Sequence, residues 1–106
     1  MTDLIKTIEL MDKLIGFPTI SSESNLDCID WISDYLKSFG ARCEITSETK
    51  GKANIFATLG PDTDGGIILS GHTDVVPVEG QNWSTDPFKM KRENNALFGR
   101  GTCDMK

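Results

Sequence analysis

The sequence is poor in the residues that would point to a thiolate metal site, a membrane span or a nucleic-acid surface. It has 3 cysteines, an odd number with no CxxC spacing, which argues against both a disulfide framework and a thiolate zinc site. No apolar run approaches the ~20 residues that span a bilayer. The 11 Lys and Arg residues are scattered and the net charge is -5. We therefore expect neither a membrane nor a nucleic acid as a partner.

The N-terminus also lacks the basic region and apolar core of a signal peptide, so we expect a cytoplasmic protein. The apolar fraction of 38% and the charged fraction of 25% are ordinary for a soluble globular chain. A length of 106 residues falls within the range of a single domain. The sequence thus predicts one folded domain, or part of one.

Two amphipathic helices are predicted in the first part of the chain. Apolar residues recur at helical spacing over residues 2–15 and again over residues 25–39. Ser24 is a candidate N-cap for the second helix. Gly16 and Gly40 are expected to end the two helices. Both helices need a sheet to pack on.

Short runs rich in β-branched or apolar residues predict that sheet. The run at 67–70 is apolar almost throughout, which is typical of a central strand buried on both faces. A turn signal at Asn94-Asn95 precedes the last run. The predicted fold class is α/β, with two helices packed on a mixed β-sheet. The predicted strands are 43–46, 54–59, 67–70 and 96–98.

The only histidine of the sequence follows the predicted central strand. His72 and Asp74 would point to the same face of an extended backbone, at the strand edge where ligands gather in α/β folds. A neutral imidazole is a common zinc ligand, and a carboxylate on its other nitrogen would fix the tautomer. Asp104 follows a glycine-flanked arginine, which suits a carboxylate presented from a loop. These residues are candidates for a metal site.

Taken one at a time, the same residues leave structural roles open. A lone histidine is usually a surface residue or a satisfied core residue, and His-x-Asp is a weak motif. Asp104 alone is typical of a helix N-cap or an exposed acid. Cys103 suggests a nucleophile, but the sequence contains no second histidine to activate it, which favours a bystander role.

Together, three runs resemble the co-catalytic zinc amidohydrolases of the M20 peptidase family. They cover residues 69–78, 80–88 and 97–106, and residues 17–25 are similar to the family's early helix-loop segment. The resemblance implies that residues 1–106 form the N-terminal portion of a zinc-peptidase catalytic domain. It also implies that the metal site lies at the C-terminal edge of the strands.

The resemblance implies a role for each candidate. His72 would be a terminal ligand of one metal, Asp74 the catalytic aspartate that orients it, and Asp104 a bridge between two metals. The implied cofactor is Zn²⁺, two ions in a complete site, with Co²⁺ as an alternative. Two metals ~3.5–4 Å apart activate a bridging water and polarise an amide carbonyl, so hydrolysis needs no protein nucleophile.

The implied substrate is a small N-acyl amino acid. Residues 80–88 and Thr102-Cys103 look more like family members that remove acetate from N2-acetyl-L-ornithine, a step of arginine biosynthesis, than like those that desuccinylate N-succinyl-diaminopimelate. A dipeptidase of the same family is a further alternative. The expected products are L-ornithine and acetate.

In such enzymes the general base, the remaining ligands and a lid domain that forms the homodimer lie further along the chain than Lys106. We therefore expect residues 1–106 to hold an incomplete site and to be inactive alone. A function of another class, a non-catalytic binding module or an inactive remnant, stays open.

Overall fold

The computed structural model describes residues 2–106, which divide into two compact units. One unit is the continuous segment 24–70. The other combines the residues up to 23 with residues 71–106. Each unit is described by itself. The elements are α1 (Asp3–Ile15), α2 (Leu26–Lys37), β1 (Arg42–Thr46), β2 (Asn54–Thr58), β3 (Lys91–Glu93) and β4 (Ala96–Phe98).

Helix α1 confirms the prediction for residues 2–15 to within one residue. Its N-cap is Thr2, whose Oγ1 accepts a hydrogen bond of 3.3 Å from the backbone N–H of Ile5, and its C-cap is Gly16. Only the C-terminal end of its apolar face is covered, since Ile15 is fully buried while Leu4 is 66% exposed. Within its own unit, α1 has no extensive contact with β3 or β4. The predicted packing of a helix on a sheet is therefore not found within this unit.

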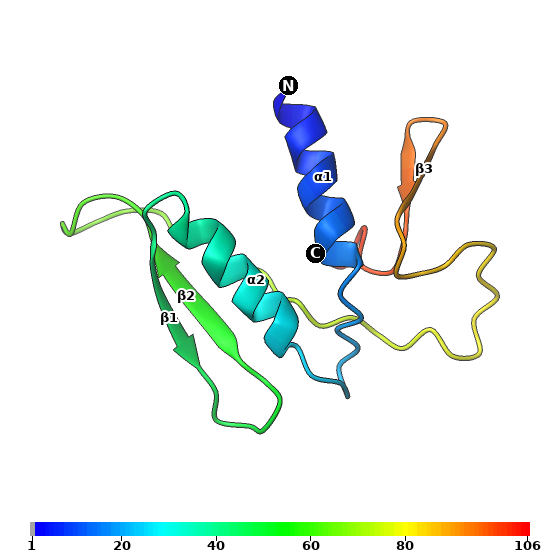
Figure 1. Cartoon of the computed structure of the whole chain (residues 1–106), viewed down its shortest axis with the longest axis horizontal. Coiled ribbons are helices and arrows are strands. Elements are labelled where there is room, and N and C mark those ends of the chain that lie inside the picture. Colours follow the sequence, from blue (N-terminus) through cyan, green and yellow to red (C-terminus); the bar gives the residue numbers. More distant parts are fainter. Residues whose placement is uncertain (1) are drawn as a thin grey trace. The chain divides into compact units, whose positions relative to one another are not determined.

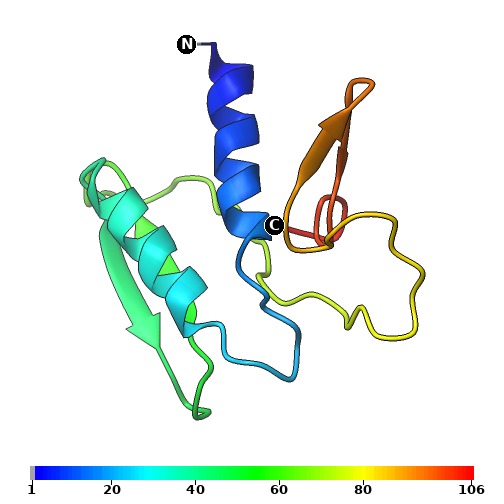
Figure 2. The ribbon, with the colours of Figure 1, turned by 45° about the vertical axis from the view of Figure 1, so that its right-hand side comes forward.

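In the unit 24–70, α2 packs on the antiparallel pair β1–β2, as Figures 1 and 2 show. The buried residues of α2 include Cys28 and Ile29. The strands pair Ile45 opposite Ile55, and Gly51, at φ 79°, lies between them. A positive φ suits glycine because it has no Cβ. The two predicted strands are confirmed, and α2 is slightly shorter than the predicted helix.

The start of α2 differs from the prediction. The N-cap position is Asn25, whose side chain makes no capping bond. Its Nδ2 donates to the carbonyl of Ala53 and its Oδ1 accepts from the N–H of Ala53, both at 2.9 Å. Ser24 Oγ accepts from the N–H of Leu26, the first residue of α2, at 3.2 Å, so Ser24 bonds the helix N-terminus from one residue before the N-cap position. The side chain of the N-cap residue Asn25 thus bonds the distant backbone of Ala53 and does not cap α2.

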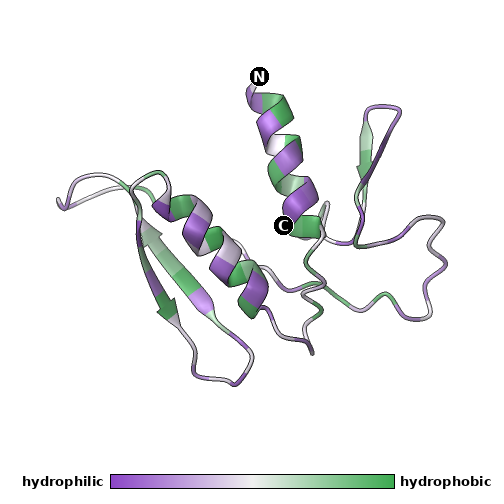
Figure 3. Cartoon of the chain, viewed as in Figure 1, coloured by the Kyte–Doolittle hydropathy of each residue, from purple (hydrophilic) through white to green (hydrophobic). Residues whose placement is uncertain are grey.

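The predicted central strand at 67–70 is wrong in this structure. Ile67, Ile68 and Leu69 are 89%, 80% and 93% exposed and lie outside any described strand. Figure 3 shows hydrophilic and hydrophobic residues alternating along both helices. A central strand needs neighbours on both edges, and within residues 2–106 the candidate neighbours β1 and β2 pair with each other. Both described sheets are two-stranded and antiparallel, so a mixed sheet is not formed.

The other unit contains the hairpin β3–β4. Its two turn residues, Asn94 and Asn95, have φ of 51° and 61°, the left-handed values of a two-residue hairpin turn. Asparagine tolerates this conformation better than most residues do. The predicted strand 96–98 and its preceding turn are confirmed.

The same unit joins two segments that are far apart in sequence. Ile20 and Val75 form a parallel bridge, with the Val75 N–H donating to Thr19 and the Ser21 N–H donating to Val75, each at 3.0 Å. Thr19 is 3% exposed and Val75 is 2% exposed. This buried pairing fixes the backbone that carries the candidate site. Within residues 2–106, neither helix is long and apolar enough to cross a membrane.

Candidate metal centre

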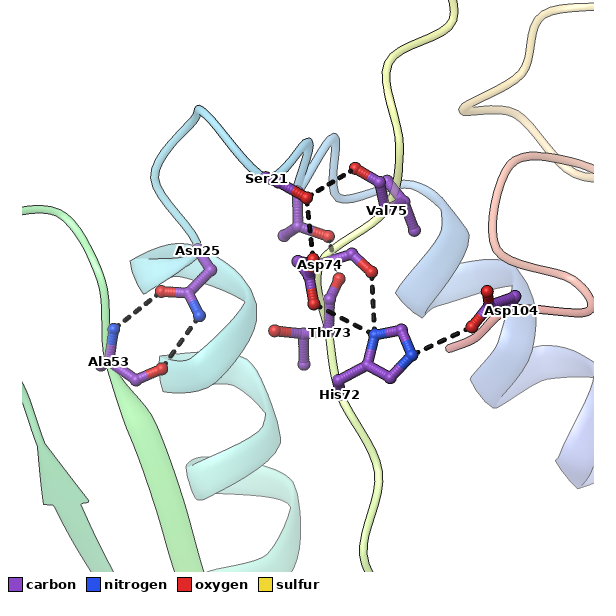
Figure 4. Close-up of polar contacts among 9 residues, drawn as sticks. Ser21, Asn25, Ala53, His72, Thr73, Asp74, Val75 and Asp104 are labelled. Atoms are coloured by element: carbon purple, nitrogen blue, oxygen red, sulfur yellow. Dashed lines mark hydrogen bonds and ion pairs between the residues drawn. The ribbon is translucent and has the colours of Figure 1, made fainter.

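Three predicted site residues meet in the unit formed by the two ends of the chain. His72 and Asp74 lie on the segment 71–75 that pairs with residues 19–21, and Asp104 lies on the turn that follows β4. Figure 4 shows the imidazole of His72 between the two carboxylates. The structure therefore brings all three residues together, without the preceding strand that the sequence predicted.

Each ring nitrogen of His72 faces oxygen. Nδ1 lies 3.0 Å from the backbone carbonyl oxygen of Asp74 and 3.1 Å from its Oδ1. Nε2 lies 3.0 Å from Oδ1 of Asp104. Because all of these oxygens are acceptors, the contacts suit a ring that donates from both nitrogens. A cation on Nε2 would leave the donor at Nδ1 in place.

These contacts shift the pKa values of His72 and Asp74. The carbonyl of Asp74 raises the pKa of His72 above its ordinary value, and the Asp104 carboxylate acts in the same direction against partial desolvation. The hydrogen bond from Ser21 lowers the pKa of Asp74, and the nearby imidazole adds to this effect. The site is open to water, with the Asp104 side chain 87% exposed.

The turn that carries Asp104 is closely packed at its base. The N–H of Arg100 donates to the carbonyl of Pro87 at 2.7 Å, and Thr102 Oγ1 donates to the carbonyl of Gly99 at 3.0 Å. Gly101 has φ 100°, and a Cβ there would come within 3.2 Å of Val75 Cγ1. Only glycine combines that φ with that contact. The turn is thereby held against the residue that follows Asp74.

A polar cluster ties the same turn to the segment 80–88. Gln81 Oε1 accepts hydrogen bonds from Trp83 Nε1, at 3.0 Å, and from the guanidinium of Arg100. The Arg100 guanidinium carbon also lies 5.2 Å from the centre of the Trp83 ring, a cation–π distance. The sequence gave no signal for Gln81 as an acceptor shared by Trp83 and Arg100.

Comparison with known proteins agrees with the resemblance in the sequence. Residues 68–106, which contain His72, Asp74 and Asp104, match the model of peptidase family M20/M25/M40. Acetylornithine deacetylase of Proteus mirabilis is 42% identical over 93% of the chain, and that of Photorhabdus laumondii is 43% identical over the same share. A Shigella sonnei acetylornithine deacetylase is 37% identical over 93% of the chain. These matches support the M20 peptidase family for this chain.

The match covers the chain almost entirely but the relatives only in part. The aligned region is 27% of the Proteus mirabilis protein and 28% of the Photorhabdus laumondii protein. The chain therefore spans about a quarter of the length of these M20 relatives.

The donor chemistry of His72 and Asp104 fits a zinc ion. Zinc takes imidazole nitrogen at ~2.0–2.1 Å and carboxylate oxygen at ~2.0–2.2 Å, which places two ligands of one tetrahedral ion about 3.3 Å apart. The Nε2 to Oδ1 separation of 3.0 Å is close to that value. The number of donors is smaller than a zinc site requires, since no group of three or more metal-binding side chains occurs within residues 2–106.

One contact of the site was not predicted from the sequence. Ser21 Oγ donates a 2.7 Å hydrogen bond to Oδ2 of Asp74 across 53 residues of sequence. The segment 17–25 was recognised only as similar to the family's early helix-loop. No spacing pattern predicts a serine–carboxylate pair at that separation, because the parallel bridge that makes it is a tertiary contact.

Proposed function

We propose that the protein containing this chain hydrolyses the amide bond of N2-acetyl-L-ornithine to L-ornithine and acetate with the help of bound Zn²⁺. The observation that carries the proposal is the imidazole of His72 held between Asp74 and Asp104 in a segment that matches the M20 family. The names of the relatives support the choice of substrate. In this proposal the reaction serves arginine biosynthesis in the cytoplasm.

The residues have distinct tasks in this reaction. His72 and Asp104 hold zinc through Nε2 and a carboxylate oxygen, and Asp74 accepts from Nδ1 so that the imidazole keeps its orientation. Zinc supplies Lewis acidity and lowers the pKa of water. Hydrolysis adds water across the amide, so that the hydroxyl goes to the acetyl carbon and a proton goes to the departing amine.

The complete site needs donors besides these two. Because residues 2–106 contain no cluster of three metal-binding side chains, we propose that further ligands and the general base come from residues outside this chain. A positioned general base commonly contributes a factor of ~10²–10⁴ to the rate. Residues 1–106 alone are then inactive. Separately, we propose that the complete enzyme is a homodimer.

The test compares the complete open reading frame with residues 1–106. The complete protein should release acetate from N2-acetyl-L-ornithine, lose this activity with EDTA and regain it with zinc or cobalt, while residues 1–106 stay at background. Its kcat/KM should exceed that for N-succinyl-LL-diaminopimelate by more than tenfold, about 1.4 kcal/mol of transition-state discrimination.

Each other outcome names a different function. Preference for the succinylated substrate would make the protein a desuccinylase, and preference for dipeptides would make it a dipeptidase. A folded complete protein that binds zinc but hydrolyses none of these substrates would favour a binding module or an inactive remnant. Gel filtration with light scattering tests the homodimer.

A further inference from the structure

The segment that carries Asp74 is held on its main chain by residues 19–21. Thr19 Oγ1 donates to the carbonyl of Thr73, and backbone bonds join Val75 to Thr19 and Ser21. These bonds lie on both sides of Asp74 in the sequence. They fix where the Cα of Asp74 lies and leave its carboxylate to be oriented by other contacts.

That carboxylate has little to hold it in place except its hydrogen bonds. The side chain of Asp74 is 57% exposed, and the terminal torsion of an aspartate is broad. Ser21 Oγ lies 2.7 Å from Oδ2, and His72 Nδ1 lies 3.1 Å from Oδ1 and 3.0 Å from the backbone carbonyl oxygen of the same aspartate. The two carboxylate oxygens are thus divided between two partners, as Figure 4 shows.

The hydroxyl of Ser21 has a choice of acceptors, and distance decides it. A serine hydroxyl has one proton to donate. The carbonyl of Val75 lies 3.4 Å from Oγ, while Oδ2 of Asp74 lies 2.7 Å away, at the usual distance for an O–H donor. A bond to a charged acceptor is also stronger than a bond to a neutral one. The proton therefore goes to Asp74.

We propose that Ser21 is a positioning residue for the metal site: its hydroxyl fixes Oδ2 of Asp74 so that Oδ1 faces Nδ1 of His72. The inference rests on the proposed function, in which Asp74 orients the imidazole that binds zinc. Ser21 touches neither the metal ligand nor the substrate in this scheme and acts only through Asp74.

The first test is kinetic and uses the zinc-loaded complete protein. Ser21→Ala should lower kcat about threefold to thirtyfold with KM changed less than twofold, a smaller effect than the 10–100-fold typical of direct partners of a metal ligand. Ser21→Thr keeps the hydroxyl and should restore at least half of kcat. Ser22→Ala removes a serine hydroxyl one residue away and serves as the matched control, so it should leave kcat within twofold of wild type.

A double-mutant cycle separates positioning from general stabilisation. If Ser21 acts through Asp74, Ser21→Ala should change kcat less than twofold in an Asp74→Asn background. An equal loss in both backgrounds would overturn the proposal, as would wild-type kcat in Ser21→Ala alone.

The second test does not depend on activity. In metal-free residues 1–106, ¹⁵N chemical shifts of the single histidine report the hydrogen bond at Nδ1. Ser21→Ala should move the Nδ1 shift while Ser21→Thr and Ser22→Ala leave it near wild type. An unmoved Nδ1 shift in Ser21→Ala would refute the positioning role. If the complete protein hydrolyses no amide, the proposed function fails, and this shift alone still decides whether Ser21 orients Asp74.

Discussion

Nε2 of His72 lies 3.0 Å from Oδ1 of Asp104, although 32 residues separate them in the sequence. With Asp74 on the other ring nitrogen, the imidazole joins a carboxylate suited to metal binding and a carboxylate suited to orientation. Loss of the metal ligand His72 and loss of the orienting carboxylate of Asp74 are therefore expected to have different effects on zinc content and rate.

The first prediction concerns these different responses in the complete protein. His72→Ala should abolish hydrolysis and lower the zinc content, because it removes a ligand. Asp74→Asn should keep most of the zinc and lower kcat about 10–100-fold, since an outer partner orients the ligand rather than holding the ion. Zinc is measured by atomic emission after dialysis, and Asp64→Asn in the loop 59–66 is the control. Wild-type rate and zinc content in Asp74→Asn would remove its assigned role.

The second prediction concerns pH in metal-free residues 1–106. The pKa of His72 is raised, first by the carbonyl of Asp74 and also by Asp104, so an NMR titration of the single histidine should give a midpoint above its ordinary value. Asp104→Asn should bring the midpoint down. A midpoint at or below the ordinary value in the wild type would contradict the contacts at both ring nitrogens.

The sign of the linked stability follows from the two shifts. A raised pKa means that His72 stabilises the fold below its unfolded-state pKa and loses this effect as the pH rises through the folded-state value. Asp74, with a lowered pKa, stabilises above its unfolded-state value and loses this effect as the pH falls through the folded-state value. The pair should stabilise the metal-free chain most at pH values above the unfolded-state pKa of Asp74 and below that of His72. Zinc should bind better above the pKa of His72, because the ring nitrogen must be deprotonated to bind it.

The third prediction separates backbone strain from packing at two glycines. Gly60 and Gly101 have φ of 106° and 100°, but a Cβ on Gly60 meets nothing within 4 Å while one on Gly101 meets Val75 and Lys106 at 3.1–3.2 Å. Gly60→Ala should cost about 1–2 kcal/mol from strain alone. Gly101→Ala should cost a further ~1–3 kcal/mol from crowding. Urea unfolding gives the free energy of unfolding of both variants. Equal losses in the two variants would mean that the turn at Gly101 rearranges around the added Cβ without an energetic cost.

The fourth prediction concerns the pairing of Asn25 with the backbone of Ala53. Asn25→Ala removes a donor and an acceptor from a backbone that is 6% exposed at Ala53, so it should cost about 2–4 kcal/mol of the free energy of unfolding. Asn25→Asp keeps the acceptor and should cost less. Thermal unfolding followed by circular dichroism measures both, and a neutral Asn25→Ala would show that water replaces the pairing.

Features encoded by neighbouring residues were predictable from the sequence. Thr2 caps α1 and Asn94-Asn95 turn the β3–β4 hairpin because each acts within a few residues of itself. The proximity of His72 to Asp74 follows from adjacency as well. In these cases the local physical chemistry and the fold agree.

Features that depend on distant partners were not predictable. The apolar run Ile67–Leu69 has the composition of a buried strand, but burial needs neighbours, and within residues 2–106 none pair with it. Ser21 has no composition signal at all, since its role depends on the bridge between Ile20 and Val75. The resemblance supplied Asp104, which spacing alone left as a possible cap.

The order in which the chain leaves the ribosome gives the discontinuous unit a further consequence. The unit 24–70 is one uninterrupted stretch and can form as soon as that stretch has emerged. The contact of Ser21 with Asp74 has to close a loop of 53 residues, and His72 meets Asp104 only when nearly the whole segment is synthesised. During synthesis, the contacts of Asp74 with Ser21 and of His72 with Asp104 can therefore form only after the whole unit 24–70 has emerged.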